Sequence, residues 1–290
     1  MSWKALVGLC VAVLAVSFGA PLARLTDAAP LAVAMWRMSL AAGLLLPVAI
    51  GGGTLKIPGQ HRPAALLAGL FLGLHFGLWI PSLWLTSVSA SVVLVATAPL
   101  FVLALSPHFL GARVGLRNLA SFGLALTGVV VIVGGDFGFS PRALAGDLMA
   151  LGGAACGAAY LVVGKRLRRE VPLLGYLGVV YAVAAVTLIL AVATLRVEPW
   201  PRTGVAWLPL LGLALGPTLV GHSLLNWALA HLEAYRVNLA LLLEPVLATA
   251  WTWLFLGEVP PLYVVPGAVL VLGALAMEYV PGRPSSGGSS

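Results

Sequence analysis

Long apolar stretches alternate along the chain with short segments that hold most of its charged residues. Each stretch approaches the roughly 20 residues that a helix needs to cross about 30 Å of hydrocarbon. Alternation with a period of two, typical of strands, is absent, and inside a bilayer only helices and closed barrels satisfy their backbone groups. The pattern predicts an all-α integral membrane protein with ten transmembrane helices, at residues 5–23, 30–50, 64–85, 89–110, 118–135, 147–164, 173–195, 205–230, 237–256 and 262–280.

The composition argues against a soluble domain. Hydrophobic residues make up 61% of the 290 residues and charged residues 9%, whereas soluble domains carry about 25% charged residues. The net charge of +7 does not indicate nucleic-acid binding, because the basic residues lie in loops beside the apolar stretches. We expect membrane lipid and a small-molecule substrate as partners and no nucleic acid. The Pro, Gly and Ser-rich tail, 281–290, is predicted to be disordered.

The distribution of Lys and Arg among the loops predicts the orientation of the chain. If both termini are cytoplasmic, the inner loops and ends hold eleven basic residues and the outer loops hold four. Cytoplasmic loops of membrane proteins carry such an excess. The sequence therefore predicts cytoplasmic termini in a multi-pass protein of the inner (plasma) membrane, with Lys165 to Arg169 as the strongest anchor.

The chain also repeats internally. Proline recurs after 146 residues, at Pro99 and Pro245, and matching Gly, Trp and Arg positions recur after 142 or 143 residues. Each half has five predicted spans, so the second half must enter the membrane in the opposite orientation. This predicts two inverted five-helix repeats, 1–140 and 141–280, with a solute site near the midplane where they meet.

Glycines at a spacing of four residues predict close helix packing in both halves. Gly69, Gly73 and Gly77 form such a ridge in the third span, and Gly212 and Gly216 repeat it in the eighth.

Two similar motifs end the two halves. The first runs from Ser91-Val-Val-Leu-Val-Ala-Thr-Ala-Pro99 to Leu110-Gly111 and Gly128; the second runs from Leu241-Leu-Leu-Glu244-Pro245 to Leu256-Gly257-Glu258, Gly267 and Gly273. With this duplicated set, and with Met35-Trp36-Arg37, the chain resembles the drug/metabolite transporter superfamily of EamA type up to about residue 280. It departs from the family at Gly111-Ala112-Arg113, where Gly-Glu-Arg is common, while Glu258 keeps the acidic residue.

The resemblance implies a ten-helix inverted architecture and a secondary transporter of small organic solutes. Members of the family differ in their substrates, which include amino acids and their derivatives, other metabolites and toxic cations. Export of hydrophobic or aromatic amino acids, or of related metabolites, by alternating access is the leading hypothesis. The alternatives are efflux of lipophilic cations, uptake of a metabolite and, more remotely, an intramembrane enzyme.

Ionisable groups inside spans are costly, so Arg37 and Glu244 are the first candidates for the substrate site. Their expected depths differ by roughly 6 to 10 Å, which two long side chains can bridge. Three readings stay open: an ion pair that locks the two halves together, an Arg37 that binds a substrate carboxylate while Glu244 receives an amine or a proton, and side chains that snorkel or cap a broken helix.

Further polar and aromatic side chains within the spans could line a pocket or merely pack. The candidates for substrate binding are Trp36, His75, Trp79, Tyr160, Tyr181, His222, Asn226 and Asn238. The alternative for the tryptophans is the interfacial aromatic belt. Pro99 and Pro245 are predicted to kink their helices or act as hinges.

Nothing in the sequence indicates catalysis or a cofactor. Asp27, Asp136 and Asp147 fall in predicted outer loops and form no paired-acid motif. No Gly-rich stretch ends in Gly-Lys-Ser or Gly-Lys-Thr, so a nucleotide loop is not expected. His75 and His222 share no metal-ligand spacing with each other or with cysteine. We therefore expect no enzyme activity, no cofactor and no metal.

Overall fold

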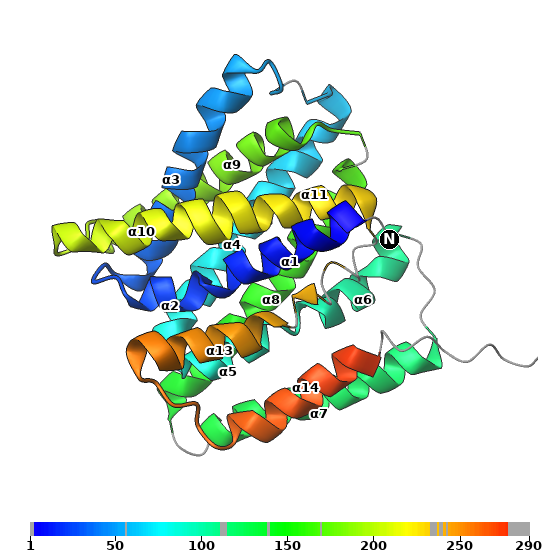
Figure 1. Cartoon of the computed structure of the whole chain (residues 1–290), viewed down its shortest axis with the longest axis vertical. Coiled ribbons are helices and arrows are strands. Elements are labelled where there is room, and N and C mark those ends of the chain that lie inside the picture. The colour runs from blue at the N-terminus through cyan, green and yellow to red at the C-terminus, as the bar shows by residue number, and fades with distance from the viewer. Residues whose placement is uncertain are drawn as a thin grey trace, which may run out of the picture.

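A computed structural model describes residues 3–55, 57–110, 115–137, 140–168, 170–232, 237, 240–241 and 243–277, and this part of the chain is helical without strands. Figure 1 shows the helices. In chain order they are α1 (Trp3–Ser17), α2 (Gly19–Arg24), α3 (Pro30–Gly51), η1 (Gly59–His61), α4 (Arg62–Leu85), α5 (Val88–Val95), α6 (Ala98–Leu110), α7 (Leu116–Phe137), α8 (Pro141–Leu167), α9 (Leu173–Thr194), η2 (Gly204–Ala206), α10 (Trp207–Leu213), η3 (Ala214–His222), α11 (Ser223–His231), α13 (Leu243–Leu256) and α14 (Val264–Met277).

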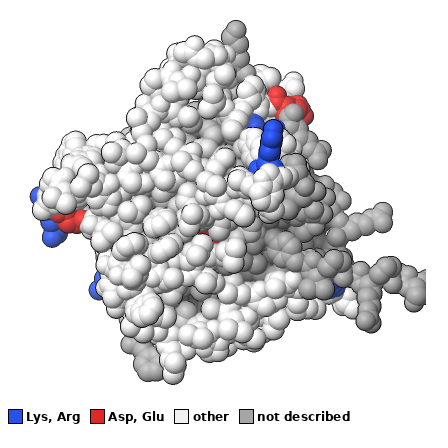
Figure 2. All heavy atoms as spheres, viewed as in Figure 1, with Lys and Arg blue, Asp and Glu red and all other residues white. Residues whose placement is uncertain are grey.

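Seven helical runs among the described residues are long and apolar enough to cross a membrane. They cover residues 3–24, 30–51, 59–85, 88–105, 141–167, 173–194 and 204–231, and shorter apolar helices lie at 119–128, 243–256 and 264–274. Most of the face in Figure 2 is formed by uncharged side chains. The prediction of an all-helical membrane protein is confirmed.

Local signals place several helix starts. Ser140 precedes α8, and its side-chain oxygen accepts a hydrogen bond from the backbone N–H of Ala143, while Pro141 occupies the first helical position. Ser87 caps α5 in the same way, with Ala90 as the donor. Such caps satisfy N–H groups that have no partner within the helix, which matters more where water is absent.

Two of the predicted spans are interrupted. The span expected at 89–110 consists of α5 and α6, with a turn at Ala96 and Thr97 between them. Pro99 therefore lies in the first turn of α6, and Pro245 lies in the first turn of α13. A proline in the first turn costs no intrahelical hydrogen bond. A turn at Ala96 and Thr97 precedes Pro99 and a turn at Leu241 precedes Pro245; the role of the two prolines as kinks or hinges stays a prediction.

The centre of the fold is α4, which packs on α8 and α9. A Cβ at Gly69 would lie 2.5 Å from Cβ of Val183, and one at Gly73 would lie 2.9 Å from Cβ of Thr187, so both glycines permit the close approach of α9. The ridge in the first half is therefore confirmed. The corresponding ridge predicted in the second half is wrong at Gly216, because nothing lies within 4 Å of a Cβ added there.

The helices α7 and α14 form a pair at one side of the molecule, as Figure 1 shows. A Cβ at Gly128 would lie 2.7 Å from the carbonyl oxygen of Gly267, which explains why the two backbones meet so closely.

Candidate substrate site

One cavity of about 70 Å³ lies between residues of the first and second halves of the chain. Its wall is formed by Val16, Arg37, His75, Trp79, Val95, Ala96, Ala98, Pro99, Gly157, Tyr160, Leu161, His222, Leu225, Leu241 and Glu244. The structure therefore brings together six of the predicted substrate-binding residues: Arg37, His75, Trp79, Tyr160, His222 and Glu244.

Both helix interruptions open onto this cavity. The last residue of α5, Val95, and the first residues of α6 belong to its wall. Leu241, just before α13, and Glu244 in its first turn also belong to the wall. Backbone groups at helix ends lack intrahelical partners, and helix N-termini favour negative charge. Broken helices in transporters place such ends at the solute site.

Arg37 projects from the middle of α3 and is only 1% exposed. Its Nε donates a hydrogen bond of 2.8 Å to the hydroxyl of Thr218, and its Cζ lies 4.0 Å from the centre of the Phe76 ring. Its Nη1 has no hydrogen-bond partner in the described part of the chain. The guanidinium is therefore fixed on one side and keeps a free donor in the wall of the cavity.

Thr218 is itself held in place by the π-helical segment η3. Its hydroxyl donates to the carbonyl of Leu213, 2.9 Å away, five residues earlier. The backbone carbonyl of Thr218 accepts a hydrogen bond of 3.2 Å from the hydroxyl of Tyr181. A π-helical turn exposes such groups to side chains of neighbouring helices and often lies at a functional site.

Glu244 occupies the first turn of α13, where its charge is favourable for the helix dipole. No ion pair within 4.0 Å joins it to Arg37; the two ion pairs in the described residues are Arg24–Glu258 and His61–Glu170. The cavity is thus lined by a guanidinium and a carboxylate that form no ion pair with each other.

His75 has a defined orientation. Its Nδ1 lies 2.8 Å from the carbonyl oxygen of Gly153, and a carbonyl only accepts, so Nδ1 is the donor and Nε2 of the neutral ring is an acceptor. The ring stacks on Trp79 with centroids 5.8 Å apart. A Cβ at Gly157 would lie 2.9 Å from Nδ1, so this glycine leaves room for the imidazole.

Two of the predicted residues hold the wall instead of forming it. Asn226 is fully buried, and its amide donates to the hydroxyl of Tyr160 and, at 2.7 Å, to the carbonyl of His222. Tyr181 is also buried and contacts Thr218 and Ser223. Both residues lie directly behind the cavity lining and fix its polar groups.

Trp36 does not line this cavity, so its role in substrate binding stays a prediction that this structure does not support by contact. Its indole N–H donates to the carbonyl of Pro199 at 2.6 Å, and its ring packs on Trp207 and Trp200 with centroids 4.8 and 5.2 Å apart. It lies on the face of α3 that meets the segment after α9, so the belt alternative describes it better. Asn238 lies outside the described residues.

Sequence reasoning missed Thr218 and Phe76, which hold the guanidinium of Arg37. It also missed the interruption residues Val95, Ala96 and Leu241. The repeated prolines were the one available signal, because they marked the two places where the spans break.

Comparisons with known proteins agree with this architecture. The chain matches the model of the EamA-like transporter family over residues 3–134 and again over residues 144–279. The uncharacterized transporter YdfC of Bacillus subtilis is 28% identical over 222 residues, which are 75% of this chain and 71% of that protein. A probable amino-acid metabolite efflux pump of Salmonella typhimurium is 26% identical over 217 residues, 72% of this chain and 70% of the relative.

A solved crystal structure matches 97% of this chain and 98% of its own with a TM-score of 0.68. At 22% sequence identity this likeness shows a shared fold alone.

Proposed function

The chain belongs to the EamA-like transporter family, and from that premise we propose that it is a secondary carrier that exports hydrophobic or aromatic amino acids, or closely related metabolites, by alternating access. It is a multi-pass membrane transporter. The family and its named relatives support transport, and the choice of substrate rests on the chemistry of the cavity.

The observation that carries the proposal is the buried guanidinium of Arg37 with its free Nη1, in one wall with the carboxylate of Glu244. An amino acid carries a carboxylate and an ammonium group on one carbon, and each would meet an opposite charge there. The rings of Trp79 and Tyr160 offer flat apolar surface to its side chain. One of the relatives is named a probable amino-acid metabolite efflux pump, which agrees with this class.

The fold we propose has ten spans in two inverted halves, 1–140 and 141–280, with cytoplasmic termini. The seven long apolar runs and the shorter helices within 119–128, 243–256 and 264–274 supply ten candidates. The cavity lies between residues of the two halves, as expected for inverted repeats. The cytoplasmic orientation rests on the Lys and Arg distribution.

The volume of the cavity indicates a closed state. Its 70 Å³ is well below the roughly 300–1,000 Å³ of ligand pockets that hold organic molecules. The carrier must therefore open before a substrate can enter, and rocking of one half against the other would enlarge the space between them.

Transport into proteoliposomes tests the proposal. Labelled aromatic and aliphatic amino acids are offered to vesicles that contain the protein, its Arg37→Gln variant or the control Arg142→Gln, whose guanidinium binds the carbonyl of Trp84 outside the cavity. We expect saturable flux in the parent and the control and a loss of at least about tenfold for Arg37→Gln, because a charge-assisted bond to the carboxylate is lost.

A second probe separates the competing substrate class. Flux of a lipophilic cation that survives Arg37→Gln and disappears in Glu244→Gln, without amino-acid flux in the parent, would refute the amino-acid assignment. It would instead favour cation efflux through the same cavity.

A further inference from the structure

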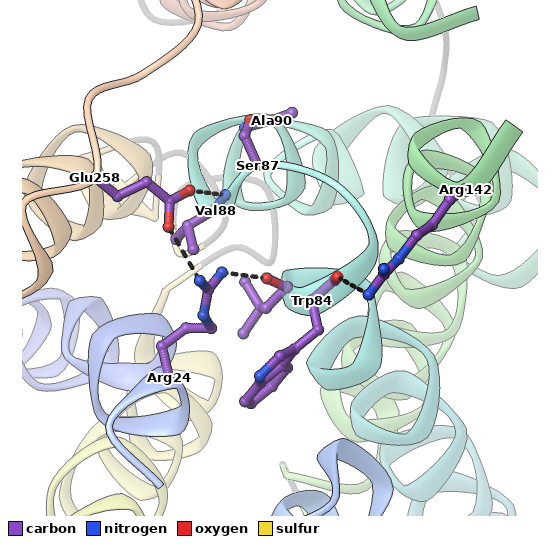
Figure 3. Close-up of polar contacts among 8 residues, drawn as sticks. Arg24, Trp84, Ser87, Val88, Ala90, Arg142 and Glu258 are labelled. Carbon is purple, nitrogen blue, oxygen red and sulfur yellow. Dashed lines mark hydrogen bonds and ion pairs between the residues drawn. The ribbon is translucent and has the colours of Figure 1, made fainter. Parts of the chain in front are cut away.

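A small group of charged and backbone atoms joins the two halves away from the cavity (Figure 3). Arg24, the last residue of α2, donates from Nη1 to the carbonyl of Leu83 at 2.5 Å, and its Nη2 lies 3.4 Å from Oε2 of Glu258. The other oxygen of Glu258 accepts a hydrogen bond of 2.9 Å from the backbone N–H of Val88. We call Arg24, Glu258 and these two backbone groups the latch.

The end of α13 aims Glu258 at this place. Gly257 follows the helix with a φ of +67°, and its N–H bonds to the carbonyl of Trp253 at 2.9 Å. This left-handed cap, which favours glycine, turns the chain sharply away from the axis of α13. Glu258 thereby reaches the N-terminus of α5, where a carboxylate is favourable.

One side of the latch is anchored to a rigid part of the fold. A Cβ at Gly146 of α8 would lie 2.8 Å from the backbone nitrogen of Thr86, so α8 presses directly against the corner between α4 and α5. The guanidinium of Arg142 donates to the carbonyl of Trp84 at 3.0 Å on the exposed side of the same corner (Figure 3), and a bond between exposed groups adds little to this packing. The corner is fixed, and the latch fastens α2 and the end of α13 to it.

The latch and the cavity lie at opposite ends of the same two helices. From the latch at Val88, α5 runs to the cavity at Val95, and α13 runs from Glu244 in the cavity towards Glu258. The helices have 8 and 14 residues, or about 12 and 21 Å at 1.5 Å per residue. They pack on each other, and both are separated from the rest of their spans by a break at the cavity. They therefore form a two-helix cover over one end of the site.

We infer that the latch is the outer gate of the carrier, closed in this structure and broken when the cavity opens to the outer side. The assignment to the outer side of the membrane depends on the orientation in the proposed function. The inference that these residues form a gate depends only on the contacts of the latch. The side chains of Arg24 and Glu258 are 27% and 24% exposed, so the protein does not enclose the pair. An ion pair of this exposure is weak, which suits a contact that must break in every transport cycle.

Labelling of a cavity cysteine tests the gate without any substrate. Cys10 and Cys156 are replaced by alanine, Leu161 in the cavity wall is changed to cysteine, and right-side-out spheroplasts are treated with a membrane-impermeant maleimide. Arg24→Gln and Glu258→Gln should each raise the labelling rate about fivefold, the population shift that loss of a partly exposed pair produces. Glu258→Gln is the milder change, because its amide oxygen still accepts from the N–H of Val88.

The control is Arg142→Gln, which removes a guanidinium from the same corner but leaves the latch intact. It should label at the parent rate. The double variant Arg24→Gln/Glu258→Gln should label no faster than the faster single variant, because both changes break one contact. Melting temperatures of the purified variants, within a few degrees of the parent, show that the fold is kept.

Equal labelling in the parent and both latch variants would overturn the gate, as would an equal increase in Arg142→Gln. Faster labelling only in inverted membrane vesicles would overturn its assignment to the outer side. The labelling experiment uses no substrate, so it tests the gate independently of the proposed function. Absence of amino-acid flux in liposomes would refute the proposed function without refuting the gate.

Discussion

Replacing Gly69 by alanine tests the closest helix contact in the centre of the fold. The added Cβ would lie 2.5 Å from Cβ of Val183 and 2.9 Å from the carbonyl oxygen of Val180, an atom of the backbone of α9. Carbon atoms in contact normally lie about 3.5–4.0 Å apart. A rotamer change cannot relieve a clash with Cβ and backbone atoms, so α4 and α9 must move apart by about 1 Å.

Forced separation of packed elements costs about 1–3 kcal/mol. The gain in helix propensity from Gly to Ala, about 1 kcal/mol, offsets part of this. We therefore expect Gly69→Ala to lower the free energy of unfolding by up to about 2 kcal/mol. Gly43→Ala in α3 measures the gain in helix propensity by itself, because nothing lies within 4 Å of the added Cβ.

Unfolding of both variants in detergent micelles, followed by circular dichroism across a series of denaturing-detergent mixtures, measures the difference. Gly43→Ala should be as stable as the parent or slightly more stable. A Gly69→Ala protein as stable as Gly43→Ala would show that α4 and α9 are not in contact at this position, and the reasoning from glycine spacing to close packing would fail.

Three further changes probe the site and its surroundings. Gly157→Ala, whose Cβ would lie 2.9 Å from Nδ1 of His75, should weaken substrate binding about tenfold, measured by the KM of flux; an unchanged KM would refute the role of this glycine. Hydrogen bonds from the hydroxyl of Thr203 and from the backbone N–H groups of Arg202 and Thr203 lower the pKa of Asp27 below 3.8. The stability that this carboxylate contributes should therefore be present above pH 3.8 and be lost as the pH falls through the lowered pKa. If Asp27→Asn does not change the acid titration of stability, this expectation is refuted. Trp36→Phe should lower stability by about 1 kcal/mol through loss of its indole hydrogen bond and leave the KM of transport unchanged, and a changed KM would return Trp36 to the site.

The helices could be predicted because lipid imposes a length and a composition on every span. The breaks could not. A proline within an apolar run shows that one backbone N–H is missing, but Pro99 fits equally a kink in a long helix and the first turn of a new one. The choice depends on whether neighbouring groups satisfy the freed carbonyls, which is a property of the packed structure.

The same limit explains which site residues were found. Arg37 and Glu244 were predictable because a charge in hydrocarbon is costly and must have a purpose. Thr218 carried no such signal, since a hydroxyl can bond to its own helix at little cost, and it became important only where η3 meets the guanidinium. The role of Trp36 could not be decided from the sequence, because an aromatic ring suits a pocket and a membrane interface equally well.

Charge is divided between the halves in the same way at the cavity and at the latch. Arg37 and Arg24 come from the first half, and Glu244 and Glu258 come from the second, at the beginning of α13 and just beyond its end. A single helix of about 21 Å therefore connects the carboxylate proposed to meet the substrate with the carboxylate proposed to close the gate. A rigid helix cannot shift at one end without a change at the other. An amino acid bound to Glu244 therefore shifts the equilibrium between the open and closed latch by the difference in its affinity for these two states. If the substrate binds both states equally, this connection carries no coupling, however tight the binding.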